Sequence, residues 1–245
     1  MDALLEANEL AFHFPTDFDK SAREFESLSS NSAIPGCVAA IDGYLLAIQT
    51  PLPSETKNVK AYCSGHYSTY GINVQAACNF KCRFVSVCVA APGGINNICA
   101  ITIAKLLDLI NNLPQKQYVV GNCAYICSEN LLTPFSGDER LSLTQNAFNF
   151  YLSQLCICIE MAFALLTQKW QILQRPMRTK LKNTGKVFMC FAWLHNFCIN
   201  EGQLAEDLDN FNLDAVEQPQ TDANTGRRTT FLQLDPLITS VRGVS

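Results

Sequence analysis

Apolar residues in the first half of the chain come in short runs of the length of β-strands. Two runs within residues 37–50 flank Gly43, so the pattern predicts a strand, a turn at this glycine and a second strand. Further runs rich in Val, Ile, Phe and Tyr cover 70–77 and 83–91. Together these segments predict an antiparallel meander.

The second half combines helical periodicity with one short strand. Apolar residues at helical spacing predict a helix over 98–110, and 117–121 has the pattern of a strand. A long apolar pattern predicts a helix over 143–173, in which Glu160 is the only acid, and another helix is predicted over 187–199. The order of elements predicts an α/β protein, with a mixed sheet that begins as an antiparallel meander and is flanked by helices.

Composition limits the classes of function. A length of 245 residues favours one domain, and 48% hydrophobic with 16% charged residues indicates a well-buried centre. A net charge of −4 argues against a free-standing nucleic-acid binder. Acids after Met1 give no sign of a secretory signal, so an intracellular protein is expected. The apolar window over 148–166 contains polar residues and predicts a buried helix rather than a membrane span.

Charge is unevenly distributed along the chain. The segment 169–186 holds six bases and no acid, namely Lys169, Arg175, Arg178, Lys180, Lys182 and Lys186. They form either a solvated helix end or a surface that faces phosphates. The stretch 201–226 has the opposite balance and predicts a disordered acidic tail over 203–245. Residues 1–33 predict a short remnant with a helix over 21–28 capped by Ser21.

Twelve cysteines are a high number for an intracellular chain. No CxxC motif occurs, so a structural zinc site has weak support, and free buried thiols in a reducing compartment explain the cysteines better. His195 lies among apolar residues of a predicted helix and is expected to be a hydrogen-bonded core histidine rather than a catalytic base.

Three positions have the chemistry of a two-metal phosphoryl-transfer site. Asp42 ends the first apolar run, Asn122 follows a later strand, and Glu160 lies on the long helix. Two Mg²⁺ ions about 3.5–4 Å apart need carboxylates to hold them and to orient a water molecule. An aspartate before a glycine is also common in turns, so Asp42 alone does not decide the matter.

Six short strings resemble, in order along the chain, segments of PIF/Harbinger-type DDE transposases and of the nuclease domesticated from them. They are Ile41-Asp42-Gly43, Tyr70-Gly71-Ile72-Asn73-Val74-Gln75-Ala76, Pro92-Gly93-Gly94-Ile95-Asn96-Asn97, Gly121-Asn122-Cys123-Ala124-Tyr125, Ile159-Glu160 and Leu194-His195-Asn196-Phe197. The resemblance implies a DDE endonuclease-like catalytic domain over 34–202. It also implies a ribonuclease-H-like fold and a divalent-metal site, with Mg²⁺ or Mn²⁺, that cuts DNA.

The resemblance also identifies where the site departs from its family. Asp42 and Glu160 match the first and last catalytic acids, whereas Asn97 and Asn122 stand where the family has aspartates. Cys156 replaces an arginine of the family pattern. Asparagine carries no charge and cannot bridge two cations, so metal binding at these four positions is expected to be weakened or lost, and cleavage impaired.

Two functions remain open from the sequence. The chain is either a transposase-derived nuclease, with an impaired or inactive hydrolase site, or a non-catalytic DNA- or protein-interaction module from a decayed transposon copy. The resemblance implies DNA as substrate and a nuclear location. Transposases that this chain resembles carry a separate DNA-binding region before the catalytic core, whereas about 33 residues precede the matched region here. The resemblance therefore implies that recognition of DNA either comes from a separate DNA-binding partner protein or is lost.

Overall fold

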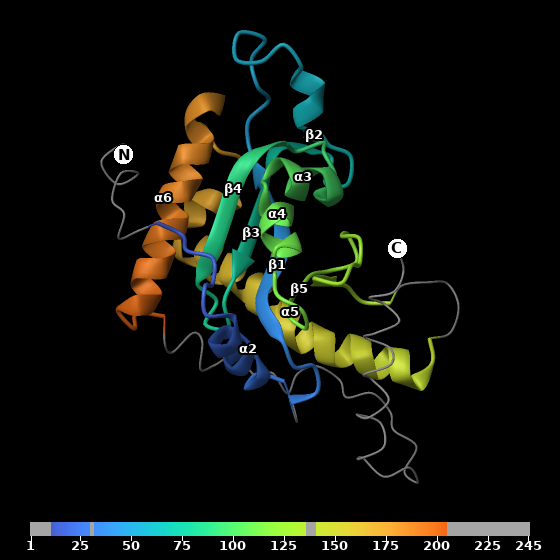
Figure 1. Cartoon of the computed structure of the whole chain (residues 1–245). Coiled ribbons are helices and arrows are strands. Elements are labelled where there is room, and N and C mark those ends of the chain that lie inside the picture. Colours follow the sequence, from blue (N-terminus) through green and yellow to red (C-terminus); the bar gives the residue numbers. More distant parts are fainter. Residues whose placement is uncertain (1–10, 30–31, 136–140, 205–245) are drawn as a thin grey trace.

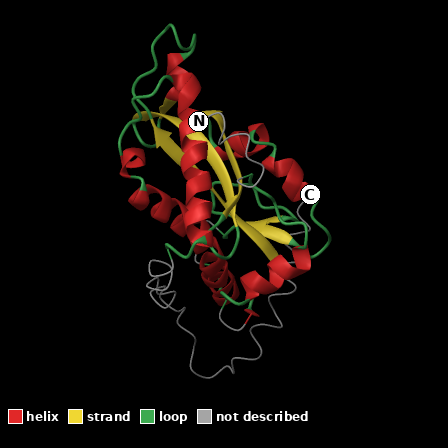
Figure 2. Cartoon of the chain, turned by 90° about the vertical axis from the view of Figure 1, so that its left-hand side faces the viewer, coloured by secondary structure: helices red, strands yellow, loops and turns green. Residues whose placement is uncertain are grey.

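The computed structural model describes residues 11–29, 32–135 and 141–204 (Figure 1). The predicted acidic tail over 203–245 lies outside the described residues from 205 onward. The rest forms a mixed α/β arrangement in which helices lie on both sides of one sheet (Figure 2). The α/β prediction is therefore confirmed, and the domain limits at 33 and 202 stay a prediction.

The sheet begins as the predicted antiparallel meander. Strand β1 (Cys37–Ala47) pairs antiparallel with β3 (Thr69–Cys78), which pairs antiparallel with β4 (Phe84–Pro92). On the other side of β1, β5 (Tyr118–Val120) and then β6 (Leu131–Leu132) add in parallel. The main strand order is therefore β4, β3, β1, β5, β6. Sequence patterns gave no sign of β6, which has only two residues.

A short excursion separates β1 from β3. It contains a 3-10 turn, η3 (Val59–Tyr62), and a two-residue strand, β2 (Cys63–Ser64), that pairs with the start of β3. This excursion projects beyond the sheet at the top of the molecule (Figure 1).

Strand β1 continues through Gly43, so the predicted turn at this glycine is wrong. Pairing with β3 is unbroken from Ala40 opposite Cys78 to Ala47 opposite Gly71. Gly43 instead provides space, because a Cβ atom there would lie 2.5 Å from Oδ1 of Asn97. Asp42 therefore lies in the middle of a strand and not at its end.

Helices form a layer on each face of the sheet. One face is covered by α5 (Leu143–Lys169) and α6 (Leu181–Asn200). The other is covered by α3 (Asn97–Ile103) and α4 (Leu106–Asn111), with α2 (Phe18–Glu26) packed beside the start of β1. Fully buried side chains fill both cores, among them Phe148, Leu152 and Phe188 under the first layer and Ile101, Leu106 and Ile110 under the second.

Helix boundaries differ from the predicted ones at four places. Lys105, with a left-handed φ of 54°, divides the predicted helix over 98–110 into α3 and α4. The long helix ends at Lys169 and is followed by a 3-10 turn, η4 (Gln171–Gln174). Helix α6 begins at Leu181 rather than at 187. Asp17, and not Ser21, caps α2, because its side chain accepts a hydrogen bond from the Lys20 backbone N–H.

Helix α5 is long and apolar enough, by length and composition, to cross a membrane. Its apolar window is 61% buried inside the protein, where it packs on β1 and β3. Burial in the core therefore accounts for the apolar composition of this helix, in agreement with the predicted buried helix.

Candidate functional site

Asp42 points from β1 toward the layer formed by α5 and α6. Side chains alternate between the two faces of a strand. Ile41 packs in the core beneath α3 and α4, whereas Tyr44 stacks on Phe163 of α5, with ring centroids 5.1 Å apart. Asp42 shares the face of Tyr44 and is half-buried there.

Asn122 lies beside Asp42 because β5 pairs in parallel with β1 and ends two residues before Asn122. Its side-chain Nδ2 donates a hydrogen bond of 2.7 Å to Oδ1 of Asp42. Its Oδ1 accepts one of 2.9 Å from the Ala124 backbone N–H, and this second bond fixes which end of the amide faces Asp42. Asn122 therefore presents an N–H group, and not its carbonyl oxygen, to the acid.

Asp42 is held in an environment that disfavours its charge. Burial raises the pKa of its carboxyl from 3.8 to about 6. The Gly43 backbone N–H, 2.6 Å away, lowers the pKa, Glu160 raises it by repulsion, and the hydrogen bond from Asn122 lowers it. Two donors thus offset only part of the effect of burial, and the carboxyl has no cation beside it.

Glu160 lies on α5, directly after the buried Ile159, and its own side chain is exposed. Its negative charge raises the pKa of Asp42, so the two carboxyl groups are near enough to repel each other. Cys156 lies one helical turn before Glu160. Burial raises the pKa of its thiol, and the charges of Glu160 and Asp42 raise it further, so Cys156 is a neutral group beside two acids.

Asn97 lies on the opposite face of the sheet. Gln75 pairs with Gly43 across the strands and so shares its face, which is not the face of Asp42. Oδ1 of Asn97 accepts hydrogen bonds of 3.1 Å from Nδ2 of Asn73 and 3.2 Å from Nε2 of Gln75. The structure therefore brings together Asp42, Asn122 and Glu160, and it does not bring Asn97 to them.

The amides around Asn97 form a buried network that sequence reasoning did not identify. Gln75 donates to Oδ1 of Asn73 at 2.7 Å, and the Tyr125 hydroxyl donates to Oε1 of Gln75 at 2.8 Å. The available signal was the pair of polar residues at alternate positions 73 and 75 of an apolar strand, where both face the same side. Tyr125 follows Asn122 in the loop after β5, so the network connects the Asn97 side of the sheet to this loop.

We expect Tyr125→Phe to destabilise the fold by about 1–3 kcal/mol, because it leaves the buried Gln75 carbonyl without its donor. The melting temperature should fall by about 2–10 °C. Tyr67→Phe is the matched control, because Tyr67 is 62% exposed and its change should have little effect. Equal effects of the two substitutions in thermal unfolding would contradict a structural role for the network.

His195 is a core residue, as predicted. It is fully buried, and its Nε2 lies 2.8 Å from the backbone oxygen of Cys82. Burial lowers the pKa of its imidazole to about 4, so the ring is neutral at pH 7.

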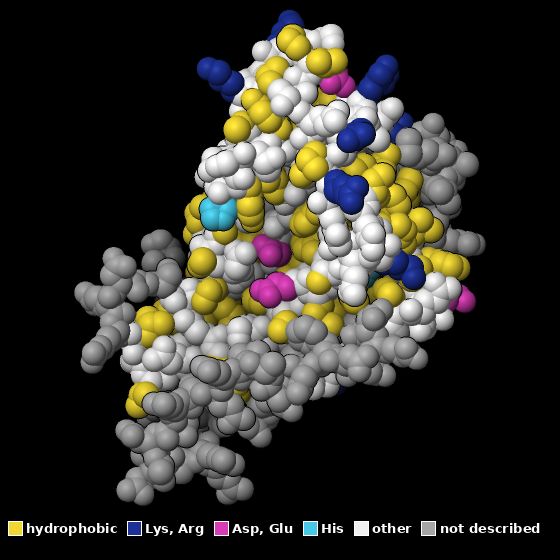
Figure 3. All heavy atoms as spheres, turned by 180° about the vertical axis from the view of Figure 1, so that it is seen from behind, with side chains coloured by type: hydrophobic (Ala, Val, Ile, Leu, Met, Phe, Trp, Pro, Cys, Tyr) yellow, Lys and Arg dark blue, Asp and Glu magenta, His cyan; other side chains and the backbone are white. Residues whose placement is uncertain are grey.

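The six predicted phosphate-facing bases lie at one end of the helix layer. Lys169 ends α5, Lys182 and Lys186 belong to the first turns of α6, and the other three lie on the connection between η4 and α6. All six side chains are exposed. Lys and Arg side chains spread over the upper part of one face, where one acidic side chain lies among them, and further acidic side chains lie lower on the same face (Figure 3).

Comparison with known proteins identifies the family. Residues 41–196 match the family described as DDE superfamily endonuclease. The chain belongs to this family. It is also 27% identical over 221 residues to "Protein ALP1-like" of Arabidopsis thaliana, in a match that covers 81% of this chain and 52% of that protein. The chain thus spans about half the length of this relative. No solved structure matches the chain.

This result confirms the resemblance to DDE-type transposases and nucleases that the six short strings indicated. The matched region includes Asp42, Asn97, Asn122 and Glu160. Endonucleases of this superfamily generally use divalent metal ions.

The residues present do not fit a two-metal site. Asp42 and Glu160 are the two acids in the cluster, and Asn122 directs an N–H group toward the position where a cation would need an oxygen. In the part of the chain that the structure describes, no group of three or more His, Cys, Asp or Glu side chains could hold a metal ion. The zinc alternative needs such a group among the cysteines. All twelve cysteines lie in the described residues as free thiols, and they form no group of this kind there.

Proposed function

We propose that this chain is a transposase-derived DDE endonuclease domain that has lost metal-dependent cleavage of DNA. By lineage its reaction is the hydrolysis of DNA phosphodiester bonds with Mg²⁺ or Mn²⁺, and its location is the nucleus. The site residues in this proposal are Asp42, Asn122 and Glu160. Asn97 is a departure from the family pattern that belongs to a separate amide network.

The topology supports a ribonuclease-H-like fold. An antiparallel meander of β4, β3 and β1 is followed by the parallel strands β5 and β6, and a long helix then returns across the sheet. This arrangement puts Asp42 on the central strand and Asn122 after the adjacent parallel strand. Glu160 reaches the same place from α5. The relative positions of Asp42, Asn122 and Glu160 support descent from a site in which all three residues were acids.

The observation that carries the proposal is the hydrogen bond from Nδ2 of Asn122 to Asp42. A metal ion bridged by two carboxylates needs an oxygen from each residue. The amide offers a donor instead, and it uses its own oxygen to bind the Ala124 backbone N–H. The charge left at the cluster is that of Asp42 and Glu160. Because its pKa is about 6, Asp42 is ionised only above about pH 6.

The test is a cleavage assay with the purified full chain and supercoiled DNA at pH 8, with 10 mM Mg²⁺ or Mn²⁺. We expect no cleavage above that of a Glu160→Gln variant, since losing one charged group from a site of this kind commonly costs ~10²–10³ in rate. Metal-dependent cleavage that Glu160→Gln abolishes would overturn the proposal.

A second candidate is a non-catalytic module that binds DNA or a protein, in which a separate DNA-binding protein supplies target recognition. The exposed bases between α5 and α6 favour this candidate. It is compatible with the loss of cleavage, and the two functions are distinguished by measuring binding in the absence of metal.

A further inference from the structure

The connection between η4 and α6 lines a large hollow. The hollow has a volume of about 1070 Å³, and residues just after β1 and at the start of β3 line it as well. Its wall combines two kinds of side chain, because Arg175 and Arg178 are charged whereas Tyr70 and Ile172 are largely apolar. Ile172 is 53% exposed there. A segment that fits this wall needs acids and apolar side chains together.

Backbone hydrogen bonds fix this connection to the sheet. The N–H of the buried Met177 donates to the Ala47 oxygen at 2.8 Å, and its oxygen accepts from the Gln49 N–H at 3.2 Å. Met177 thus adds in parallel to the end of β1. Arg175 and Arg178 lie on either side of this fixed residue, and both side chains are exposed.

Described acids do not neutralise the two arginines of the hollow. Arg175 and Arg178 form no ion pair with any acid of the described residues. Glu55 lines a smaller adjoining hollow, but its carboxylate accepts hydrogen bonds from the backbone N–H groups of Leu52 and Leu181, at 3.1 and 2.9 Å. Glu55 therefore caps α6, and the larger hollow keeps its positive charge.

Most acids of the chain lie outside the described residues. The described residues hold fourteen of the eighteen Lys and Arg but only ten of the twenty-two Asp and Glu. The stretch 205–226, which follows α6, has six acids and no base. Its part 211–222 combines three acids with three apolar residues larger than alanine, namely Asp214, Glu217 and Asp222 with Phe211, Leu213 and Val216. Both properties of the wall of the hollow therefore have a counterpart in this stretch.

The length of the chain decides which of these acids can reach the hollow. Leu204, the last described residue, is buried just after the end of α6. Helix α6 has 20 residues, so its two ends are about 30 Å apart. One extended residue spans at most about 3.3–3.6 Å. Glu206 is therefore too close to Leu204 to reach the start of α6, whereas Asp214, ten residues beyond Leu204, and Glu217 can.

We propose that residues 211–222 of this chain lie in the hollow, with their acids on Arg175 and Arg178 and their apolar side chains against Tyr70 and Ile172. Arginine binds carboxylates through two parallel N–H donors, which suits the two exposed guanidinium groups. A linked segment has an effective concentration in the millimolar range, which favours binding within one chain over binding to a second copy. The proposal goes beyond the proposed function, because it involves no metal ion, nucleic acid or residue of the Asp42 cluster.

The test is cross-linking of the full chain with a carbodiimide, which joins carboxylates directly to lysine amines, followed by mass spectrometry. We expect Asp214 and Glu217 to be joined to the exposed Lys180 or Lys182, and Glu206 to neither. Replacing both Arg175 and Arg178 with Gln should lower the yield at these lysines about 5-fold, because two exposed ion pairs are lost while the lysines remain. An unchanged yield in this double variant would overturn the proposal.

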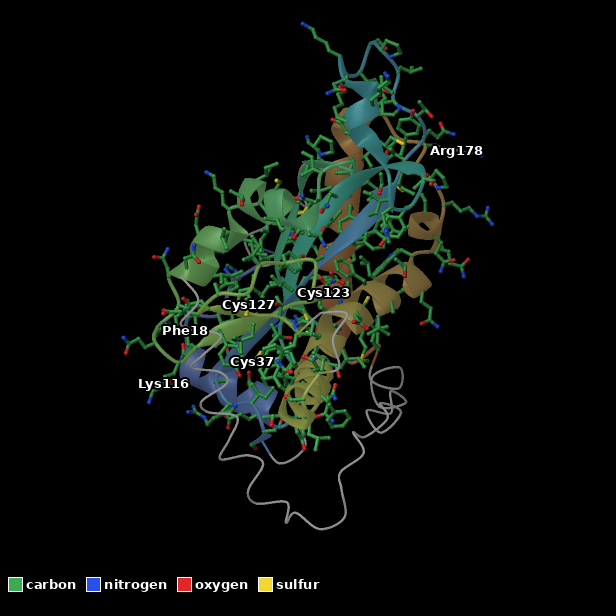
Figure 4. The ribbon with its side chains drawn as sticks, turned by 90° about the vertical axis from the view of Figure 1, so that its right-hand side faces the viewer. Phe18, Cys37, Lys116, Cys123, Cys127 and Arg178 are labelled. Atoms are coloured by element: carbon green, nitrogen blue, oxygen red, sulfur yellow. The ribbon has the colours of Figure 1, made fainter. Side chains whose placement is uncertain are left out.

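Lys116→Gln is the control variant and should leave the yield unchanged, because Lys116 lies at the other end of the molecule from Arg178 (Figure 4). Cross-links of Asp214 to Lys116 as abundant as those to Lys180 would contradict a specific site. A mixture of ¹⁵N-labelled and unlabelled chains identifies cross-links between two copies, and a majority of these would also overturn the proposal.

Circular dichroism checks the fold of each variant. Should the double variant fail to fold, the unchanged protein provides a second measurement, because raising the salt from about 50 to 500 mM should weaken the exposed ion pairs and lower the yield. A yield that does not respond to salt would overturn the proposal. No DNA or metal ion is present in these experiments, so their failure is separate from a failure of the proposed function.

Discussion

Asn122→Asp is expected to restore Mg²⁺-dependent DNA cleavage at pH 8, whereas Asn97→Asp is not. The first change replaces the N–H donor beside Asp42 with a second carboxylate and gives the cluster three acids. The second adds an acid on the opposite face of β1. Restoring one group of an electrostatic site should raise the rate by about 10²-fold. A supercoiled plasmid assay with both variants measures the difference.

Asn97→Asp is a matched control because it makes the same chemical change at a second asparagine where the family has an aspartate. The amide groups of Asn73 and Gln75 both donate to residue 97, so a carboxylate can be accommodated there. Equal activation by the two substitutions would show that the separation of Asn97 from Asp42 is not what decides metal chemistry. Activation that survives a further Glu160→Gln change would exclude Glu160 from the site.

Asp42→Asn is expected to stabilise the protein at pH 8 and to have almost no effect at pH 4. The folded pKa of Asp42, about 6, is above the ordinary value of 3.8. Near pH 4 and below, the carboxyl is largely neutral in the folded state and its burial costs little. As the pH rises toward 6 the unfolded state ionises more readily, so the folded state loses stability relative to it, and above pH 6 the full cost remains.

This cost is about 2–3 kcal/mol for a shift of this size. The asparagine variant can keep the acceptor for Gly43 and Asn122 without the charge, so its melting temperature should exceed that of the unchanged protein by about 4–10 °C at pH 8. Thermal unfolding from pH 4 to 8 tests this, with Asp108→Asn as the control on the exposed side of α4. A loss of stability that is the same at every pH would contradict a raised pKa for Asp42.

Much of this arrangement could be predicted from local patterns. The runs of apolar residues identified β1, β3, β4 and β5, because buried strands leave a continuous apolar signal. The resemblance of six short strings to DDE transposases assigned Asp42, Asn122 and Glu160 to one site, and it assigned Asn97 to the same site, which the structure does not bear out. Helix α6 was predicted only in part, since its first turns hold polar residues, among them Thr184, which is buried all the same.

The remaining features depend on contacts between distant segments. A glycine after an acid predicts a turn, but Gly43 continues a strand because β3 pairs with it. The side chain of Asn97 occupies the position that a Cβ atom at residue 43 would take. The face on which Asn97 lies depends on the register between β1 and β3, which no short string contains. Glu55 caps α6 from 126 positions away, so this cap has no local sequence signal.

Binding of Mn²⁺ measured by electron paramagnetic resonance at pH 8, where Asp42 is ionised, tests most directly the claim that Asn122 has removed the metal site. The unchanged protein is predicted to leave Mn²⁺ free up to about 1 mM, while Asn122→Asp binds it below that concentration. Equal binding by the two proteins, lost in each on Glu160→Gln, would contradict the claim.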